Sequence, residues 1–170
     1  MLLISFNIKV TFLEDYRKKI ILKVKSWRKI AKKYDDYFIK FALEYFAFIA
    51  LLRINYSKNE YVIDRNLIDS LKKSIRNNRN IIKESNIMNL KTLLDEKPLR
   101  KWKRDGSYEP IWIKSLDDFD SVIEAVYQIR NNLFHGRKGH NICRDQNLVK
   151  VGYNILTDIN DFFIKKILYI

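Results

Sequence analysis

The residues best suited to catalysis stand together in one short run in the last third of the chain. This run is Arg130-Asn131-Asn132-Leu133-Phe134-His135, followed by Gly136. RNA cleavage without a metal needs a group that exchanges protons with the ribose 2′-OH or the leaving 5′-oxygen, and histidine suits this near neutral pH. It also needs a cation on the phosphate, which arginine supplies through paired donors. We therefore expect His135 to move the proton, Arg130 to hold the phosphate and Asn131 to fix their geometry.

The spacing of Arg130 and His135 is weak support by itself, since such pairs are common and a catalytic role must rest on geometry. A histidine at a helix end often serves only as a cap for exposed carbonyl groups. Three further features favour catalysis. They are consecutive asparagines in a helix that disfavours them, a polar face directed outward, and Gly136 as a helix stop.

One helix is predicted to position these residues, and it begins near Ser115-Leu116-Asp117-Asp118, where serine takes the cap and an acid follows three residues on. Its apolar, core-facing stripe consists of Phe119, Val122, Ile123, Val126, Ile129 and Leu133. Arg130 lies at the edge of this stripe. A polar row falls on the opposite face: Glu124, Gln128, Asn131 and His135. Since this row points away from the core, we expect a two-fold dimer to pack it against its copy and to share one cleft.

The run from Arg130 to Gly136, continued by Arg137 and Lys138, resembles the signature of HEPN domains, in which a histidine follows an arginine and a polar residue by four to six positions. Asp145 with the apolar helix after it, and the aromatic residues from Phe41 to Leu52, look like helices of one prokaryotic branch of that family. The resemblance covers about residues 35–170. Within it, residues 57–114 form an insertion without a counterpart.

The resemblance implies a bundle of four or five helices and a homodimer with the motif-bearing helix at its interface. It also implies metal-independent endoribonuclease activity that leaves a cyclic phosphate, with Arg130 and His135 as the catalytic pair, Asn131 as their helper and no cofactor. Family members act as toxins paired with nucleotidyltransferase antitoxins, as antiviral effectors, or as non-catalytic modules. The alternative function is therefore a HEPN module that binds a nucleotide or a nucleotidyltransferase antitoxin. A basic helical RNA-binding protein without chemistry is a third candidate.

A basic, irregular segment over residues 95–114 supplies further RNA-binding candidates. Lys101, Trp102, Lys103 and Arg104 suit a clamp on a phosphate chain with a base stacked on the tryptophan. Arg137 and Lys138 add positive charge beside the motif. The alternative is a solvated loop whose tryptophan fills the core. His140 is a weaker phosphate candidate, because a solvated loop histidine explains it better.

The other segments are predicted to be helical except at the N-terminus. Residues 2–13 alternate in part between apolar and polar, which indicates a strand or extended arm. Helical spacing follows over residues 14–55, interrupted at Asp35 and Asp36, which look like a helix cap. Tyr37 to Tyr56 is apolar almost all round and is predicted to be the central helix. Residues 66–94 indicate two further helical pieces, so we expect one all-α domain over residues 1–170, with residues 1–34 as an N-terminal arm and helix.

Composition narrows the partners. Lys and Arg number 33 against 20 Asp and Glu, and the net charge of +13 favours a polyanion such as RNA, although a solvated basic surface is an equal explanation. The single cysteine, Cys143, excludes an internal disulfide and a Cys-rich zinc site. There is no secretory signal pattern and no apolar run of the ~20 residues that a bilayer requires. We therefore expect a cytoplasmic protein with no membrane partner.

Overall fold

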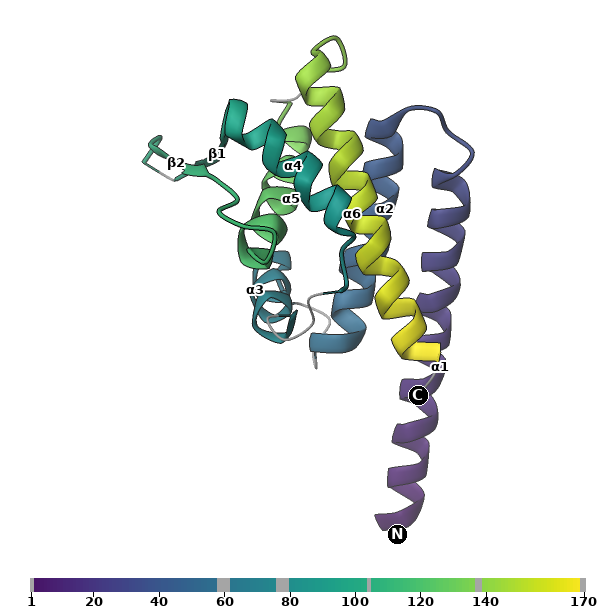
Figure 1. Ribbon diagram of the computed structural model, residues 1–170. Coiled ribbons are helices and arrows are strands. Elements are labelled where there is room, and N and C mark those ends of the chain that lie inside the picture. The colour runs from purple at the N-terminus through teal and green to yellow at the C-terminus, as the bar shows by residue number, and fades with distance from the viewer. Residues whose placement is uncertain (1, 58–61, 76–79, 104, 137–138, 169–170) are drawn as a thin grey trace.

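The computed structural model describes residues 2–57, 62–75, 80–103, 105–136 and 139–168, with the backbone alone at residues 2–14, 75 and 168. Within these residues the chain forms six helices and one two-stranded antiparallel sheet (Figure 1). A mostly helical bundle confirms the predicted fold class at that level, with one helix more than the upper number expected. Among the described helices, none is both long and apolar enough to cross a membrane.

Helix α2, Tyr37–Tyr56, is the central helix, as predicted, and packs against α1, α3 and α6. It begins where expected, because Asp36 Oδ1 accepts a hydrogen bond from the Phe38 amide at 2.7 Å. Its closest neighbour is α6, Cys143–Leu168. A Cβ atom at Gly152 of α6 would lie 2.9 Å from Cε2 of the buried Phe41, so the missing side chain permits this close approach.

Helix α1, Leu2–Ala31, shows that the predicted strand or arm over residues 2–13 is wrong. The apolar residues of that run also recur at helical intervals, as Leu3, Phe6, Val10 and Leu13, and a short window does not separate the two periods. A helix satisfies its own backbone groups, whereas a strand needs a partner. The first half of α1 extends beyond the bundle in Figure 1. Ile21 and Val24 of its second half are buried in the core.

Two shorter helices, α3 (Asp64–Ile75) and α4 (Glu84–Glu96), confirm the two helical pieces predicted over residues 66–94. Helix α3 packs against α2 and α5, and α4 packs against α6. The segment expected to be an insertion therefore contributes directly to the bundle, and α3 covers part of the helix that bears the motif.

Helix α5, Phe119–Phe134, carries the motif and begins three residues later than a Ser115 cap predicts. Its cap is Asp118, whose Oδ1 accepts from the Ser121 amide at 3.2 Å and whose Oδ2 accepts from the Lys114 amide at 3.1 Å. Ser115 instead forms the turn before the helix, where its carbonyl accepts from the Asp118 amide. Serine and aspartate are both good caps, so the sequence pattern alone does not rank them.

The segment expected to be irregular contains a hairpin of strands β1 (Leu99–Trp102) and β2 (Tyr108–Ile111). Trp102 lies opposite Tyr108 in the antiparallel register, and the loop between them uses Gly106 at a φ of 83°. Leu99 and Ile111 are buried at the base of the hairpin, which extends from the side of the bundle (Figure 1). A two-stranded ribbon this short has no alternating pattern long enough to predict it.

Candidate functional site

Arg130, near the C-terminal end of α5, is held by two rings and two polar partners. Its guanidinium carbon lies 5.3 Å from the centre of the Tyr45 ring and 4.8 Å from that of Phe134. Nη1 donates to Asn131 Oδ1 at 3.0 Å, and Nη2 lies 3.6 Å from Asp64 Oδ2. The side chain is 27% exposed, so its orientation is restrained while part of it remains accessible.

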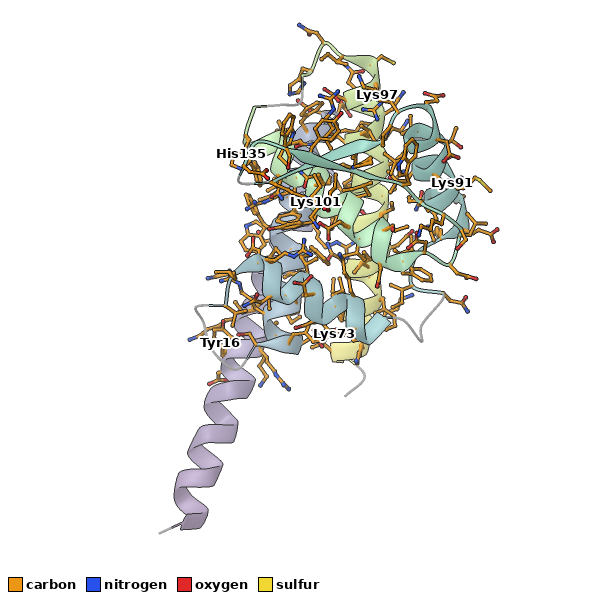
Figure 2. All side chains as sticks on the ribbon, turned by 90° about the vertical axis from the view of Figure 1, so that its left-hand side faces the viewer. Tyr16, Lys73, Lys91, Lys97, Lys101 and His135 are labelled. Carbon is orange, nitrogen blue, oxygen red and sulfur yellow. The ribbon has the colours of Figure 1, made fainter. Side chains whose placement is uncertain are left out.

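His135 follows the last residue of α5 as its C-cap, with its side chain exposed to solvent. Figure 2 shows it at the edge of the molecule. Its amide donates to the Asn131 carbonyl at 3.0 Å. Gly136 then takes a φ of 66°, as expected for a left-handed helix stop, and its amide donates to the Leu133 carbonyl at 3.1 Å. The imidazole is therefore accessible to a ligand from outside the chain.

The angular positions on α5 separate the arginine from the histidine. At 100° per residue, five residues place Arg130 and His135 about 140° apart around the helix axis. Asn131 and His135, four residues apart, share one face, while Arg130 shares its face with Phe134. Within one chain, the helix therefore directs the two predicted catalytic groups to different sides.

The prediction that the whole polar row of α5 points away from the core is wrong for its first half. Glu124 and Gln128 are buried, because α3 and the hairpin pack over this part of the helix. Glu124 accepts from Arg65 Nη1 at 2.8 Å and from Lys72, and Lys101 Nζ lies 3.4 Å from it. Burial opposes ionisation here, but the hydrogen bonds and charges of Arg65 and Lys72 outweigh it and lower the pKa of Glu124 to about 2.

The asparagines of the motif have different environments. Asn132 is buried, and its Oδ1 accepts from Gln128 Nε2 at 3.0 Å. Asn131 is half-buried and contacts Arg130 directly. Of the consecutive asparagines, Asn131 is therefore the one placed to assist Arg130, and Asn132 supports the packing of α5.

The hairpin residues predicted to bind RNA are in part already engaged within the protein. Lys101 is paired with Glu124, and Lys103 Nζ lies 2.6 Å from Glu109 Oε1. Trp102 is 39% exposed and its ring centre lies 5.4 Å from that of Tyr108, so it does not fill the core. Three other predicted residues, Arg104, Arg137 and Lys138, lie outside the described residues.

A basic hollow of about 480 Å³ lies between the hairpin and the start of α6. Its walls include Lys97, Arg100, Trp102 and Arg144 together with the motif residue Asn132. Arg144 was not predicted from the sequence, because only the fold brings the start of α6 to β1. Arg144 donates to the Lys97 carbonyl across this junction.

The second histidine, His140, contacts residues near the start of α2. Its ring stacks on Phe38 at 3.9 Å, and Nδ1 lies 3.8 Å from Asp36 Oδ2. Over the described part of the chain, no three His, Cys, Asp or Glu residues gather as a metal site would require. The motif at the end of α5 is thus the better candidate for a catalytic site.

Two residues that orient Arg130 were missed by sequence reasoning. Tyr45 was assigned to the aromatic core stripe of α2, and Asp64 carried no signal at all. Both are distant from the motif along the chain, so no local spacing pairs them with it. Comparison with protein-family models, curated proteins and solved structures finds no match for this chain.

Proposed function

We propose that this protein is a metal-independent endoribonuclease of the HEPN type. The observation that carries the proposal is the end of α5, where Arg130 is oriented by Asn131 and the exposed His135 caps the helix. These are the residue types that cleavage through a ribose 2′-OH needs. The net charge of +13 supports a polyanionic substrate.

In this mechanism, each residue of the motif has one role. His135 takes the proton from the 2′-OH as the 2′-oxygen attacks the phosphorus. The bond to the 5′-oxygen breaks, His135 returns the proton to that oxygen, and a cyclic phosphate forms. Arg130 stabilises the charge on the phosphate oxygens, and Asn131 keeps the guanidinium in place. The phosphate of the substrate competes with Asp64 for Arg130. This exchange costs little free energy, because Arg130 and Asp64 are separated by 3.6 Å and their ion pair is weak.

We further propose that two chains form each active site. The separation of Arg130 and His135 around α5 supports this proposal, because a two-fold pairing can bring the histidine of one chain to the arginine of the other. Phe134 and Phe46 support this face as the interface, because both are exposed and their rings stack at 6.4 Å. Exposed aromatic side chains of this kind are typical of interface centres.

The deciding experiment is cleavage of total RNA in excess EDTA by wild type, His135→Ala and Arg130→Ala, with His140→Ala as the matched control. We expect wild type and the control to cleave and both motif variants to be inactive. Melting curves establish that each variant is folded. If wild type is folded and inactive on every RNA, the proposal is wrong and a non-catalytic HEPN module becomes the better interpretation.

Mixing the two inactive variants tests the shared site. If Arg130 and His135 come from different chains, a mixed dimer regains one intact site, and a random mixture recovers about a quarter of wild-type activity. If both residues act within one chain, the mixture stays inactive. A monomer in light scattering at micromolar concentration contradicts the two-chain site in either case.

A further inference from the structure

The first part of α1, residues 2–13, extends away from the bundle. Figures 1 and 2 show this projecting segment from two directions at right angles, and in both views no other described element lies beside it. Its sequence is nevertheless mostly apolar, with Lys9 as the one charged residue. The apolar residues are Leu2, Leu3, Ile4, Phe6, Ile8, Val10, Phe12 and Leu13. A helix of this composition is normally buried, so something outside the bundle is needed to cover it.

The apolar residues of the projecting segment fall on two opposite sides of the helix. At 100° per residue they form two stripes, Leu3, Phe6, Val10 and Leu13 on one side and Ile4, Ile8 and Phe12 on the other. A second helix that packs along one stripe leaves the other stripe in water, because a two-helix seam covers one side only. The acyl chains of lipids cover both sides at once. The pattern therefore favours a lipid surface over a second copy of the helix.

The length of the projecting segment suits one leaflet of a bilayer. Residues 2–13 rise by ~18 Å at 1.5 Å per residue, and the hydrocarbon of one leaflet is ~15 Å deep, so a tilted helix of this length stays within it. We expected no membrane partner because no apolar run reaches ~20 residues. That length is needed to span a bilayer, but a helix that enters one leaflet is shorter.

Three helices contribute exposed cations to the end of the bundle from which the segment extends. Tyr16 on α1 and Lys73 on α3 mark this end in Figure 2, and α6 also ends there (Figure 1). The exposed cations of this basic end are Arg17, Lys18, Lys19, Lys73, Lys165 and Lys166. Two acidic residues, Glu14 and Asp15, reduce this charge without cancelling it. A surface of this kind attracts anionic lipid headgroups.

We propose that residues 2–13 insert into one leaflet of an anionic lipid membrane, with the basic end of the bundle against the headgroups. The apolar segment supplies attachment through burial in the acyl chains, and the cations select an anionic surface. The two signals act together, as stable attachment without a spanning helix requires. None of these residues belongs to the motif at the end of α5, so the proposal does not rest on the proposed function.

The test is flotation of the full chain with vesicles of phosphatidylcholine and phosphatidylserine in equal parts, compared with vesicles of phosphatidylcholine alone. We expect at least tenfold tighter binding to the mixed vesicles, because each cation near an anionic surface contributes about fivefold. Phe6→Gln should weaken this binding about tenfold or more and leave the melting temperature unchanged, since the segment lies outside the bundle. Leu22→Gln is the matched control on the same helix. Leu22 is 67% exposed but lies beyond the projecting segment, so its replacement should have little effect.

A second pair of variants tests the basic end apart from α1. Lys73→Gln/Lys166→Gln should weaken binding to the mixed vesicles more than tenfold, because two cations are removed from the headgroup side. Lys91→Gln/Lys97→Gln removes the same charge away from this end, as Figure 2 shows, and should have a much smaller effect.

The proposal is overturned if the folded protein binds neither kind of vesicle, if Phe6→Gln and Leu22→Gln behave alike, or if the two lysine pairs behave alike. It is also overturned if the protein assembles without lipid, ignores vesicles and loses the assembly in Phe6→Gln. A second copy then covers the segment. All these results are read from vesicle binding and assembly, so they stay distinct from a failure of the ribonuclease assay.

Discussion

Replacing Arg28 by methionine tests the ionic junction that fastens α1 to the bundle. Arg28 Nε donates to both oxygens of Glu44, at 3.0 and 3.1 Å, and Nη1 donates to Asp161 at 2.7 Å. The Glu44 side chain is only 1% exposed, and it also accepts from Asn160 Nδ2 at 2.6 Å. The junction therefore joins α1 to α2 and α6, and α1 forms one wall of a cavity of about 380 Å³ beside Arg130.

The cost of Arg28→Met follows from the burial of Glu44. Removing one partner of a buried ion pair leaves an uncompensated charge and costs ~3–5 kcal/mol. The bond to Asp161 adds little, because that carboxylate is largely exposed. For a domain of this size, each kcal/mol lowers the melting temperature by ~2–4 °C, so we expect a decrease of roughly 6–20 °C.

Urea and thermal unfolding followed by circular dichroism measure this change. Arg17→Met, on the exposed face of the same helix, is the control and should shift the free energy of unfolding by less than ~0.5 kcal/mol. The double variant Arg28→Met/Glu44→Leu removes both charges and should recover most of the loss. The reasoning is refuted if Arg28→Met remains within ~1 kcal/mol of wild type, or if the double variant is as unstable as the single one.

Three further predictions concern the motif helix, its end and the hairpin. Because the pKa of Glu124 is lowered from 4.5 to about 2 in the folded state, its contribution to stability is complete above pH 4.5 and is lost as the pH falls toward 2. Glu124→Gln should flatten this part of the stability profile in urea unfolding at pH 6 and pH 3, and an unchanged profile would contradict the assignment. In Gly136→Ala the added Cβ meets no atom within 4 Å, but the residue must keep a φ of 66°. We therefore expect the free energy of unfolding to fall by about 1 kcal/mol in thermal unfolding; no loss would mean that the turn tolerates a Cβ. Lys103→Ala should weaken RNA binding and reduce the salt dependence by about one ion without changing stability, whereas Lys91→Ala, on α4 (Figure 2), should not; equal effects would argue against the hairpin as an RNA contact.

Long, strongly patterned helices were the part of the fold that the sequence predicted well. Helix α2 begins and ends where its apolar spacing and the Asp36 cap place it, and α5 buries the predicted stripe as far as Ile129, with Leu133 half-buried. Both signals are local, since a helix satisfies its backbone within itself and displays one face to the core. The prediction for residues 2–13 was wrong because their apolar residues fit periods of both two and 3.6, and nothing else in that window decides between a strand and a helix.

At the end of α5, too, the local features of the candidate site were predicted from the sequence and the contacts with distant segments were not. The sequence placed Arg130, Asn131 and His135 within one helical end and predicted the left-handed Gly136, because residues close along the chain share a known local geometry. It did not predict that α3 would bury Glu124, or that Arg65 and Lys72 would neutralise it. The only sequence feature that could have indicated this contact is the spacing of Arg65 and Lys72, which lie seven residues apart on one face of α3.

The sequence by itself thus determined the long patterned helices, the cap of α2 and the short motif that suggests chemistry. Only the tertiary structure decided what surrounds that motif: the ring of Tyr45 and the carboxylate of Asp64 beside Arg130, and the cavity that they share with α1. The physical reason is that side-chain packing between distant segments depends on how the helices dock. The residue pattern of a single segment does not show how the helices dock. Docking nevertheless sets both the burial of a functional group and the charges around it.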